Sequence, residues 1–325
     1  MSSAKKKLGL GRLAYQLYHR PIGLMAESLR AGGPMEQWRT DRGRRAMEAA
    51  AHTLAPLPAA LAGERPLELH LMTGRRFWYQ TAFCLATFGR QARRPLAPVI
   101  YDDGSLTEQW RSALARVAPA TRFVSIGEIV ARLDANLPES RYPSLRERWR
   151  HFPLLRKLTD VHVGRAGWRL FIDSDLLFFH EPRLLLDWLD RPTRPLRATD
   201  VQNAYGYPLE LLAEIAGQPV PERVNTGLCG LRSEELDWDR MEFWCRTLIE
   251  RGGTQYYQEQ ALVALLLAGR DCLVAPIADY VTLPRLPEVR ECRAIMHHYV
   301  AESKKWYFRY NWTRVLADAS NPLPA

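Results

Sequence analysis

Two aspartates separated by one residue, Asp173 and Asp175, stand at the end of an apolar stretch of the sequence. The stretch, Trp168–Ile172, is short and rich in aromatic residues, which predicts a buried β-strand. Burying two unpaired carboxylates at the end of such a strand would be costly. A divalent cation between them would offset that cost, because Mg²⁺ and Mn²⁺ prefer hard oxygen ligands. The stretch therefore predicts a strand that delivers a metal site to the edge of a sheet.

The preceding segments predict the sheet that would hold this strand. Apolar periodicity predicts strands at residues 67–72, 97–101 and 121–124, with helices at residues 77–88 and from residue 106 onward. Strands separated by helices of this length imply a parallel, doubly wound α/β sheet. Ligands bind at the carboxyl ends of the strands in such sheets, so the loops 73–76 and 102–105 should face the same crevice as Asp173.

Polar residues also follow or begin the later predicted elements. One strand ends at Asp200, and the next contains Asn225 and Gly227, where the missing side chain would let the backbone approach a ligand closely. Glu259 and Gln260 open a predicted helix. These patterns also have ordinary interpretations: a solvated turn at the two aspartates, a helix cap at the 102–105 loop and an edge-strand turn at Gly227.

Two motifs together make the chain resemble a known family. Asp173-Ser174-Asp175 resembles the Asp-x-Asp motif of GT-A glycosyltransferases, which transfer a sugar from a nucleotide-sugar donor. Residues 298–306 resemble the His-x-x-Gly-x-x-Lys-Pro-Trp segment of glycosyltransferase family 8, with Ala301 in place of the glycine and Lys305 in place of the proline. The resemblance implies a GT-A, Rossmann-like α/β fold with a mixed, mostly parallel sheet flanked by helices.

The resemblance also implies a metal site and a donor site. Asp173, Asp175 and His298 would be the metal ligands, and an imidazole ligand would favour Mn²⁺ over Mg²⁺. Lys304 would bind the donor diphosphate. The other residues implied at the donor are Arg156, which stands 17 residues before Asp173, together with Asn225, Glu259, Thr73 and Arg76, and the pair expected to be catalytic, Asp200 and Gln260. The family usually has aspartate in place of Glu259, so the reach of that carboxylate differs here.

The implied function is metal-dependent transfer of a sugar from a nucleotide sugar, expected to be a UDP-sugar, to a glycan or lipid-linked acceptor. Resemblance to family 8 suggests a retaining, hexosyltransferase-like enzyme, whereas an inverting GT-A enzyme would use Asp200 or Glu259 as a base. Two other classes fit parts of the pattern. One is a sugar-phosphate nucleotidyltransferase, although residues 73–76 are poor in glycine for that class. The other is a non-catalytic binding protein for an anionic polysaccharide or a membrane.

Composition limits the class of protein further. Of the 325 residues, 47% are hydrophobic and 25% are charged, as in soluble globular proteins, and the apolar run 261–268 is too short to span a bilayer. The net charge of +9 favours an acidic partner, but the arginines are not interleaved with aromatic residues, so no nucleic-acid module is predicted. The five cysteines include no Cys-x-x-Cys pair, and reduced thiols in a cytoplasmic protein are expected.

Three regions are predicted along the chain. Residues 1–65 would form a basic helical preface, residues 66–310 the GT-A catalytic domain and residues 311–325 an unpatterned tail. The preface is expected either to pack on the domain or to lie on a membrane surface, as a basic amphipathic helix at residues 12–30 would. The expected location is cytoplasmic, including the inner face of a membrane.

Overall fold

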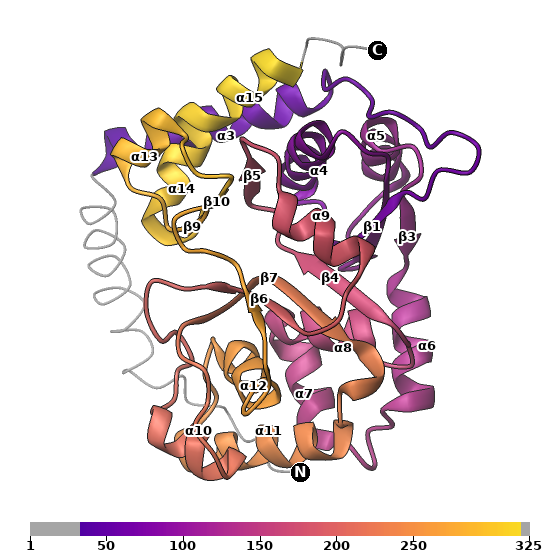
Figure 1. Cartoon of the computed structure of the whole chain (residues 1–325), viewed down its shortest axis with the longest axis vertical. Coiled ribbons are helices and arrows are strands. Elements are labelled where there is room, and N and C mark those ends of the chain that lie inside the picture. Colours follow the sequence, from indigo (N-terminus) through magenta and orange to yellow (C-terminus); the bar gives the residue numbers. More distant parts are fainter. Residues whose placement is uncertain (1–32, 320–325) are drawn as a thin grey trace, which may run out of the picture.

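Seven strands form the central sheet in the order β3-β2-β1-β4-β7-β6-β8 (Figure 1). The computed structural model describes residues 33–319. The strands are β1 (Leu67–Thr73), β2 (Leu96–Asp102), β3 (Arg122–Val124), β4 (Trp168–Ile172), β6 (Leu196–Thr199), β7 (Val224–Arg232) and β8 (Leu273–Val274). Only β7 runs antiparallel to its neighbours, β4 and β6. This mixed, mostly parallel sheet confirms the predicted fold class.

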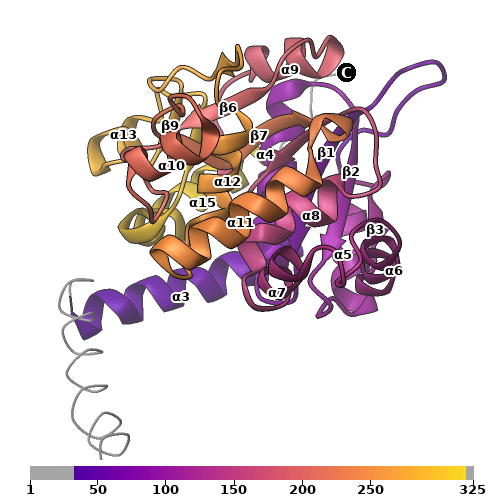
Figure 2. The ribbon, with the colours of Figure 1, turned by 90° about the horizontal axis from the view of Figure 1, so that it is seen from below.

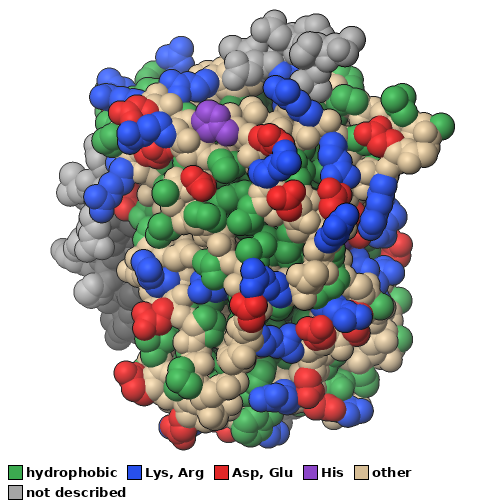
Figure 3. Space-filling model, viewed as in Figure 1, with side chains coloured by type: hydrophobic (Ala, Val, Ile, Leu, Met, Phe, Trp, Pro, Cys, Tyr) green, Lys and Arg blue, Asp and Glu red, His purple; other side chains and the backbone are tan. Residues whose placement is uncertain are grey.

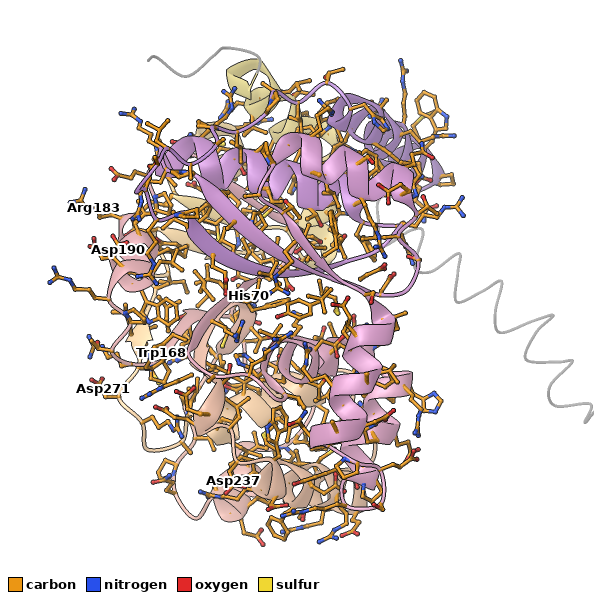
Figure 4. The ribbon with its side chains drawn as sticks, turned by 90° about the vertical axis from the view of Figure 1, so that its right-hand side faces the viewer. His70, Trp168, Arg183, Asp190, Asp237 and Asp271 are labelled. Atoms are coloured by element: carbon orange, nitrogen blue, oxygen red, sulfur yellow. The ribbon has the colours of Figure 1, made fainter. Side chains whose placement is uncertain are left out.

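Helices cover both faces of the sheet because its inner strands are apolar on both sides. On β4, Leu170 and Ile172 belong to one core, whereas Phe171 belongs to the other. The α-helices between β1 and residue 306 are α4 (Trp78–Ala92), α5 (Glu108–Val117), α6 (Ile126–Asn136), α7 (Pro143–His151), α8 (Arg156–His162), α9 (Arg183–Asp190), α10 (Leu209–Ala216), α11 (Trp238–Gly252), α12 (Gln258–Leu266), α13 (Leu286–Glu291) and α14 (Lys304–Trp306). In the side view, His70 of β1 lies in the interior, whereas Arg183 and Asp271 lie at the surface (Figure 4).

A second, three-stranded sheet lies beside the first and was not predicted. It contains β5 (Leu176–Phe178), β9 (Tyr280–Thr282) and β10 (Met296–His298), with β10 in the middle. Strand β10 is antiparallel to β5 and parallel to β9. Because β5 follows β4 after only three residues, the small sheet joins the late part of the chain to the end of β4.

The two ends of the described chain pack together. Helix α3 (Pro34–Ala51) contacts α15 (Trp312–Ala319) and the π-helical segment η5 (Tyr307–Asn311), and α3 and α15 lie side by side in Figure 1. Helix α15 differs from the unpatterned tail expected over residues 311–325: Trp312 and Val315 are buried against the core. The helix predicted at residues 12–30 lies outside the described residues.

The surface of the described chain has mixed charge on the face that Figure 3 shows, where basic and acidic side chains alternate around a more apolar middle. Many charged side chains of the described residues are paired, as in the contacts of Arg194 with Asp271 and of Arg251 with Glu214. Within residues 33–319, no helix is both long and apolar enough to cross a bilayer.

Candidate active site

Asp173 and Asp175 lie in the link between β4 and β5, where the chain leaves the central sheet for the small one. The backbone N–H of Asp173 donates to the Gly227 carbonyl at 2.8 Å, so the ladder between β4 and β7 continues as far as the first aspartate. The side chains of Asp173 and Asp175 are only 22% and 13% exposed. Two largely desolvated carboxylates at this spacing are stable only if cations balance their charge.

The small sheet brings His298 to the acid pair. Its antiparallel register places His298 opposite Leu176, the residue directly after Asp175. The His298 Nε2 atom lies 3.3 Å from Asp175 Oδ1 and 3.5 Å from Asp173 Oδ2, within ion-pair distance but without hydrogen-bond geometry. Burial alone would lower the pKa of His298, but the two carboxylates outweigh burial and raise that pKa to about 9.

Two lysines contribute the remaining positive charge at the acid pair. Lys157 of α8 places its Nζ atom 2.8 Å from each carboxylate oxygen of Asp173, and it is buried. Lys304 Nζ lies 3.2 Å from Asp175 Oδ2, but its side chain is 40% exposed. Burial would raise the pKa of both aspartates, yet Lys157 and His298 lower the pKa of Asp173, and His298 and Lys304 lower that of Asp175. The acid pair is therefore ionised.

The three residues predicted as metal ligands lie close enough together to share one cation. One oxygen or nitrogen atom from each of Asp173, Asp175 and His298 lies within 4.8 Å of the others. The buried His298 Nε2 atom has no hydrogen-bond partner among the described residues, as expected of a nitrogen that faces a ligand. Two carboxylates and an imidazole suit Mn²⁺ and related ions. These residues could hold a divalent cation once His298 has lost its proton.

The start of β7 lies beside the acid pair and also contributes to a second polar cluster, which is formed by Asp200, Asn225 and Gln260. Asn225, Thr226 and Gly227 follow one another there, and all three are buried. A Cβ atom on Gly227 would lie 2.2 Å from His298 Cε1 and 2.9 Å from Asp173 Oδ2. Only glycine therefore lets β7 pass behind these two side chains, so the predicted close approach at Gly227 is towards the acid pair.

We expect Gly227→Ala to weaken divalent-cation binding by at least tenfold, because the added methyl must displace either His298 or Asp173. Isothermal titration with Mn²⁺ measures the change. The matched control is Gly127→Ala on α6, where a Cβ atom would meet nothing closer than Ser125 Oγ at 3.9 Å. Equal Mn²⁺ affinity in the two variants would contradict the prediction.

The second cluster joins the residues predicted to orient the donor sugar. Asp200 Oδ2 accepts hydrogen bonds from Asn225 Nδ2 at 2.9 Å and from Gln260 Nε2 at 3.2 Å. Its Oδ1 atom accepts from the Val201 backbone N–H at 2.7 Å. Asp200 directly follows β6, Asn225 lies on β7 and Gln260 lies on α12, and each is less than a tenth exposed. The chain thus brings these three predicted residues together.

Glu259 lies beside Thr226, the residue between Asn225 and Gly227 on β7. Its Oε2 atom accepts a hydrogen bond of 2.9 Å from the Thr226 hydroxyl. Burial raises the pKa of Glu259 to about 7, although the charge of Lys157 acts in the opposite direction. This carboxyl group therefore changes its charge near neutral pH, unlike Asp173 and Asp175.

The other three residues predicted to contact the donor, Thr73, Arg76 and Arg156, have different environments in the structure. Thr73 ends β1, and its buried hydroxyl oxygen has no partner among the described residues. Arg76 is exposed and lies over the Phe77 ring. Arg156 is buried, donates from Nε to Asp160 at 2.7 Å, and reaches the backbone carbonyls of the turn after β2. Arg156 therefore fastens that turn, and its described contacts do not include the acid pair.

Lys157 was not among the predicted site residues. It directly follows Arg156 on α8, and adjacent residues on a helix point about 100° apart. The sequence signal was the pair itself, two adjacent cations on the helix that precedes β4. Which of them does so depends on how the seven-residue helix packs, and spacing along the chain does not determine that packing.

Comparison with known proteins gives structural likenesses only. No protein-family model matches the sequence, and no curated protein matches it. The structure is similar to the bifunctional glycosyltransferase WbbM, with a TM-score of 0.50 and 11% identity over 81% of this chain and 53% of WbbM, so the chain spans about half of that protein.

Two other solved structures give similar alignments. The galactosyltransferase LgtC, in complex with donor and acceptor sugar analogues, aligns with a TM-score of 0.49 and 14% identity over 79% of this chain and 98% of LgtC. Mouse xyloside xylosyltransferase 1 aligns with a TM-score of 0.47 and 12% identity over 72% of this chain and 98% of its own. At the level of its architecture, the chain has the GT-A glycosyltransferase fold.

Proposed function

We propose that the protein is a metal-dependent glycosyltransferase that uses a nucleotide sugar, expected to be a UDP-sugar, as the donor. One observation carries the proposal: Asp173, Asp175 and His298 converge beside the cluster of Asp200, Asn225 and Gln260 at the start of β7. A site for a diphosphate-bound cation and a polar site for a sugar would then share one strand. The acceptor class that we propose is a glycan or a lipid-linked sugar.

Each residue has a role in this proposal. Asp173, Asp175 and His298 would hold Mn²⁺ or Mg²⁺, which supplies Lewis-acid stabilisation to the departing diphosphate. Lys304 would shift from Asp175 to the diphosphate, because its side chain is the more exposed of the two lysines at the acid pair. The residues proposed to contact or orient the donor are Asp200, Asn225, Glu259, Gln260, Thr73 and Arg76, with Arg156 fastening the turn after β2.

A single set of assays separates this proposal from its alternatives. Incubation with UDP-sugars and Mn²⁺ should release UDP, and release should require the cation. A sugar-phosphate nucleotidyltransferase would instead release pyrophosphate from a nucleoside triphosphate and a sugar phosphate. A binding protein would release neither. No UDP release from any of a panel of UDP-sugars, with pyrophosphate formed from the triphosphate, would overturn the proposal.

Cation affinity should rise with pH. His298 carries a proton below pH about 9 in the cation-free protein, and a cation must displace that proton, so affinity should increase about tenfold from pH 7 to pH 8. The raised pKa of His298 also stabilises the cation-free fold fully below pH about 6.5, and this contribution is lost as the pH rises through about 9.

Titration calorimetry with Mn²⁺ across this pH range checks the slope. His298→Gln should bind more weakly and lose most of the slope; any slope that remains between pH 6 and 8 would report Glu259, whose pKa is about 7. A wild-type affinity that stays constant from pH 7 to pH 8 would contradict the assignment of His298 as a ligand.

For the location, we propose the cytoplasm, with peripheral association at the inner face of a membrane, where a lipid-linked acceptor would be found. The net charge of +9 supports this proposal, because the cytoplasmic leaflet carries anionic lipids. The region 1–65, proposed as a basic helical preface whose helix α3 packs on the catalytic domain, is the part of the chain expected to contribute to the association.

A further inference from the structure

One face of helix α3 packs on the rest of the described chain, and the opposite face is exposed. Arg309 reaches from η5 to Glu36 and Thr40, and Met47 is fully buried. A Cβ atom on Gly43 would lie 2.1 Å from the Phe308 carbonyl oxygen, so α3 rests directly on the backbone of η5 there. These positions, 36, 40, 43 and 47, recur at helical spacing and form the inner face of α3.

The outer face of α3, defined as Met35, Trp38, Arg42 and Arg45, has an unusual composition for a solvated surface. Met35 and Trp38 are 62% and 52% exposed, among the most exposed large apolar side chains of the described chain. The Arg42 guanidinium lies over the Trp38 ring, 5.6 Å from its centre. All four positions point away from the inner face, and α3 runs along the outside of the molecule in Figure 2.

This combination matches the chemistry of a bilayer surface. Tryptophan is enriched at the level of lipid headgroups because its ring is apolar and its N–H is polar. Arginine can lay its methylene stem on apolar surface while its guanidinium binds a lipid phosphate. Each arginine near an anionic membrane contributes about 1 kcal/mol to attraction. In water, the exposed apolar area of a tryptophan and a methionine on one side of a helix has no favourable contact.

The charge of the preceding segment agrees with this interpretation. Residues 1–32 contain six Lys or Arg residues and one Glu, a net charge of +5, and they lead directly into α3. We infer that the outer face of α3 is the surface through which the protein docks on an anionic lipid bilayer. The inference extends the proposed membrane association, and it is independent of whether the protein transfers sugar.

Vesicle cosedimentation with the full chain tests the inference. Vesicles of phosphatidylcholine alone are compared with vesicles that also contain phosphatidylglycerol. Wild type should bind the anionic vesicles and be released by salt. Arg42→Gln/Arg45→Gln should weaken that binding about 30-fold, or about fivefold for each charge. Trp38→Ala/Met35→Ala should also weaken it, because the apolar contacts with the interface are lost.

Helix α11, at the opposite end of the long axis in Figure 1, supplies matched controls. Phe243 is 49% exposed there, and Arg240 and Arg246 are exposed. Phe243→Ala and Arg240→Gln/Arg246→Gln should bind vesicles like wild type. All the variants change outward side chains, so circular dichroism should show the wild-type fold.

Two results would overturn the inference. The first is equal vesicle binding by the α3 and α11 variants, which would assign any binding to other parts of the chain. The second is a concentration-dependent dimer in sedimentation velocity that the α3 variants abolish, without vesicle binding by wild type. In that case the outer face of α3 would meet a second copy of the chain.

Discussion

Lys157→Met is expected to make the stability of the protein depend on a divalent cation. In the wild type, the Lys157 ammonium contacts both oxygens of Asp173, and it is almost completely buried. Methionine has a similar length but no charge, so among the described residues His298 would be the one remaining cationic group within ion-pair distance of Asp173. Removing one partner of a buried ion pair typically costs about 3–5 kcal/mol. Because Asp173 keeps some exposure, we expect a loss of about 3 kcal/mol in the free energy of unfolding.

A cation bound by Asp173 and Asp175 would replace the missing charge. Mn²⁺ should therefore raise the melting temperature of Lys157→Met more than that of wild type, where Lys157 already balances Asp173. Lys157 is ionised in the wild type: burial acts to lower its pKa, but Asp173, Glu259 and Asp175 raise it above the ordinary value. Differential scanning calorimetry with Mn²⁺ or with a chelator measures both effects.

Lys305→Met is the control for this experiment. Lys305 lies over the Trp306 ring, and its described contacts do not include the acid pair. Its replacement should change neither the stability nor the response to Mn²⁺. If Mn²⁺ shifts the melting temperatures of Lys157→Met, Lys305→Met and wild type equally, then Lys157 does not neutralise the charge of Asp173.

The parts of the fold that were predictable are those with local signals. Alternating apolar residues identified β1, and short apolar runs identified β2 and β4. Because β4 is buried on both faces, its polar continuation, Asp173 and Asp175, could be placed at its end. Connections made of helices predicted the parallel half of the sheet. The antiparallel direction of β7 had no such signal, because a strand has the same periodicity in either direction.

The small sheet was missed because its strands are too short to have a periodic pattern. Strands β5 and β10 have three residues each and pair across more than a hundred residues of chain. That pairing is what carries His298 to Asp175, so His298 was identified through the resemblance of residues 298–306 to a family motif and not through any pattern of its own strand. Helix α15 was missed for a related reason. Its stability comes from packing Trp312 and Val315 on the core, which a local pattern does not reveal.

The candidate site shows the same division between local and non-local information. Asp200, Asn225 and Gln260 were predicted separately, but the hydrogen bonds that join them depend on three elements meeting. The choice between Arg156 and Lys157 rests on the rotation of one short helix about its axis. Spacing along the sequence could identify the helix, but only its packing determines which side chain reaches Asp173 and which fastens the turn after β2.

Lys304→Ala is expected to lower the rate of sugar transfer about a hundredfold while leaving cation affinity nearly unchanged. In the proposed reaction, negative charge moves onto the diphosphate oxygens as the glycosidic bond breaks. A lysine that meets this charge interacts more strongly with the transition state than with the bound donor. Losing one such contact typically costs about 2–4 kcal/mol. Lys304 is placed for this movement, since it lies 3.2 Å from Asp175 Oδ2 at the accessible side of the acid pair.

Lys305→Ala removes the same charge one residue further on and is the matched control. The Lys305 ammonium is 4.5 Å from the centre of the Trp306 ring and has no acidic partner among the described contacts, so its loss should leave turnover within about twofold of wild type. Release of UDP at saturating donor and Mn²⁺ gives the comparison, and calorimetric titration of Mn²⁺ shows that the cation site persists in both variants.

Similar losses of turnover in the two variants would mean that Lys304 contributes only general positive charge. A loss of Mn²⁺ binding in Lys304→Ala would mean that this lysine supports the acid pair itself, because its contact with Asp175 would then be structural and not a resting position before the donor arrives.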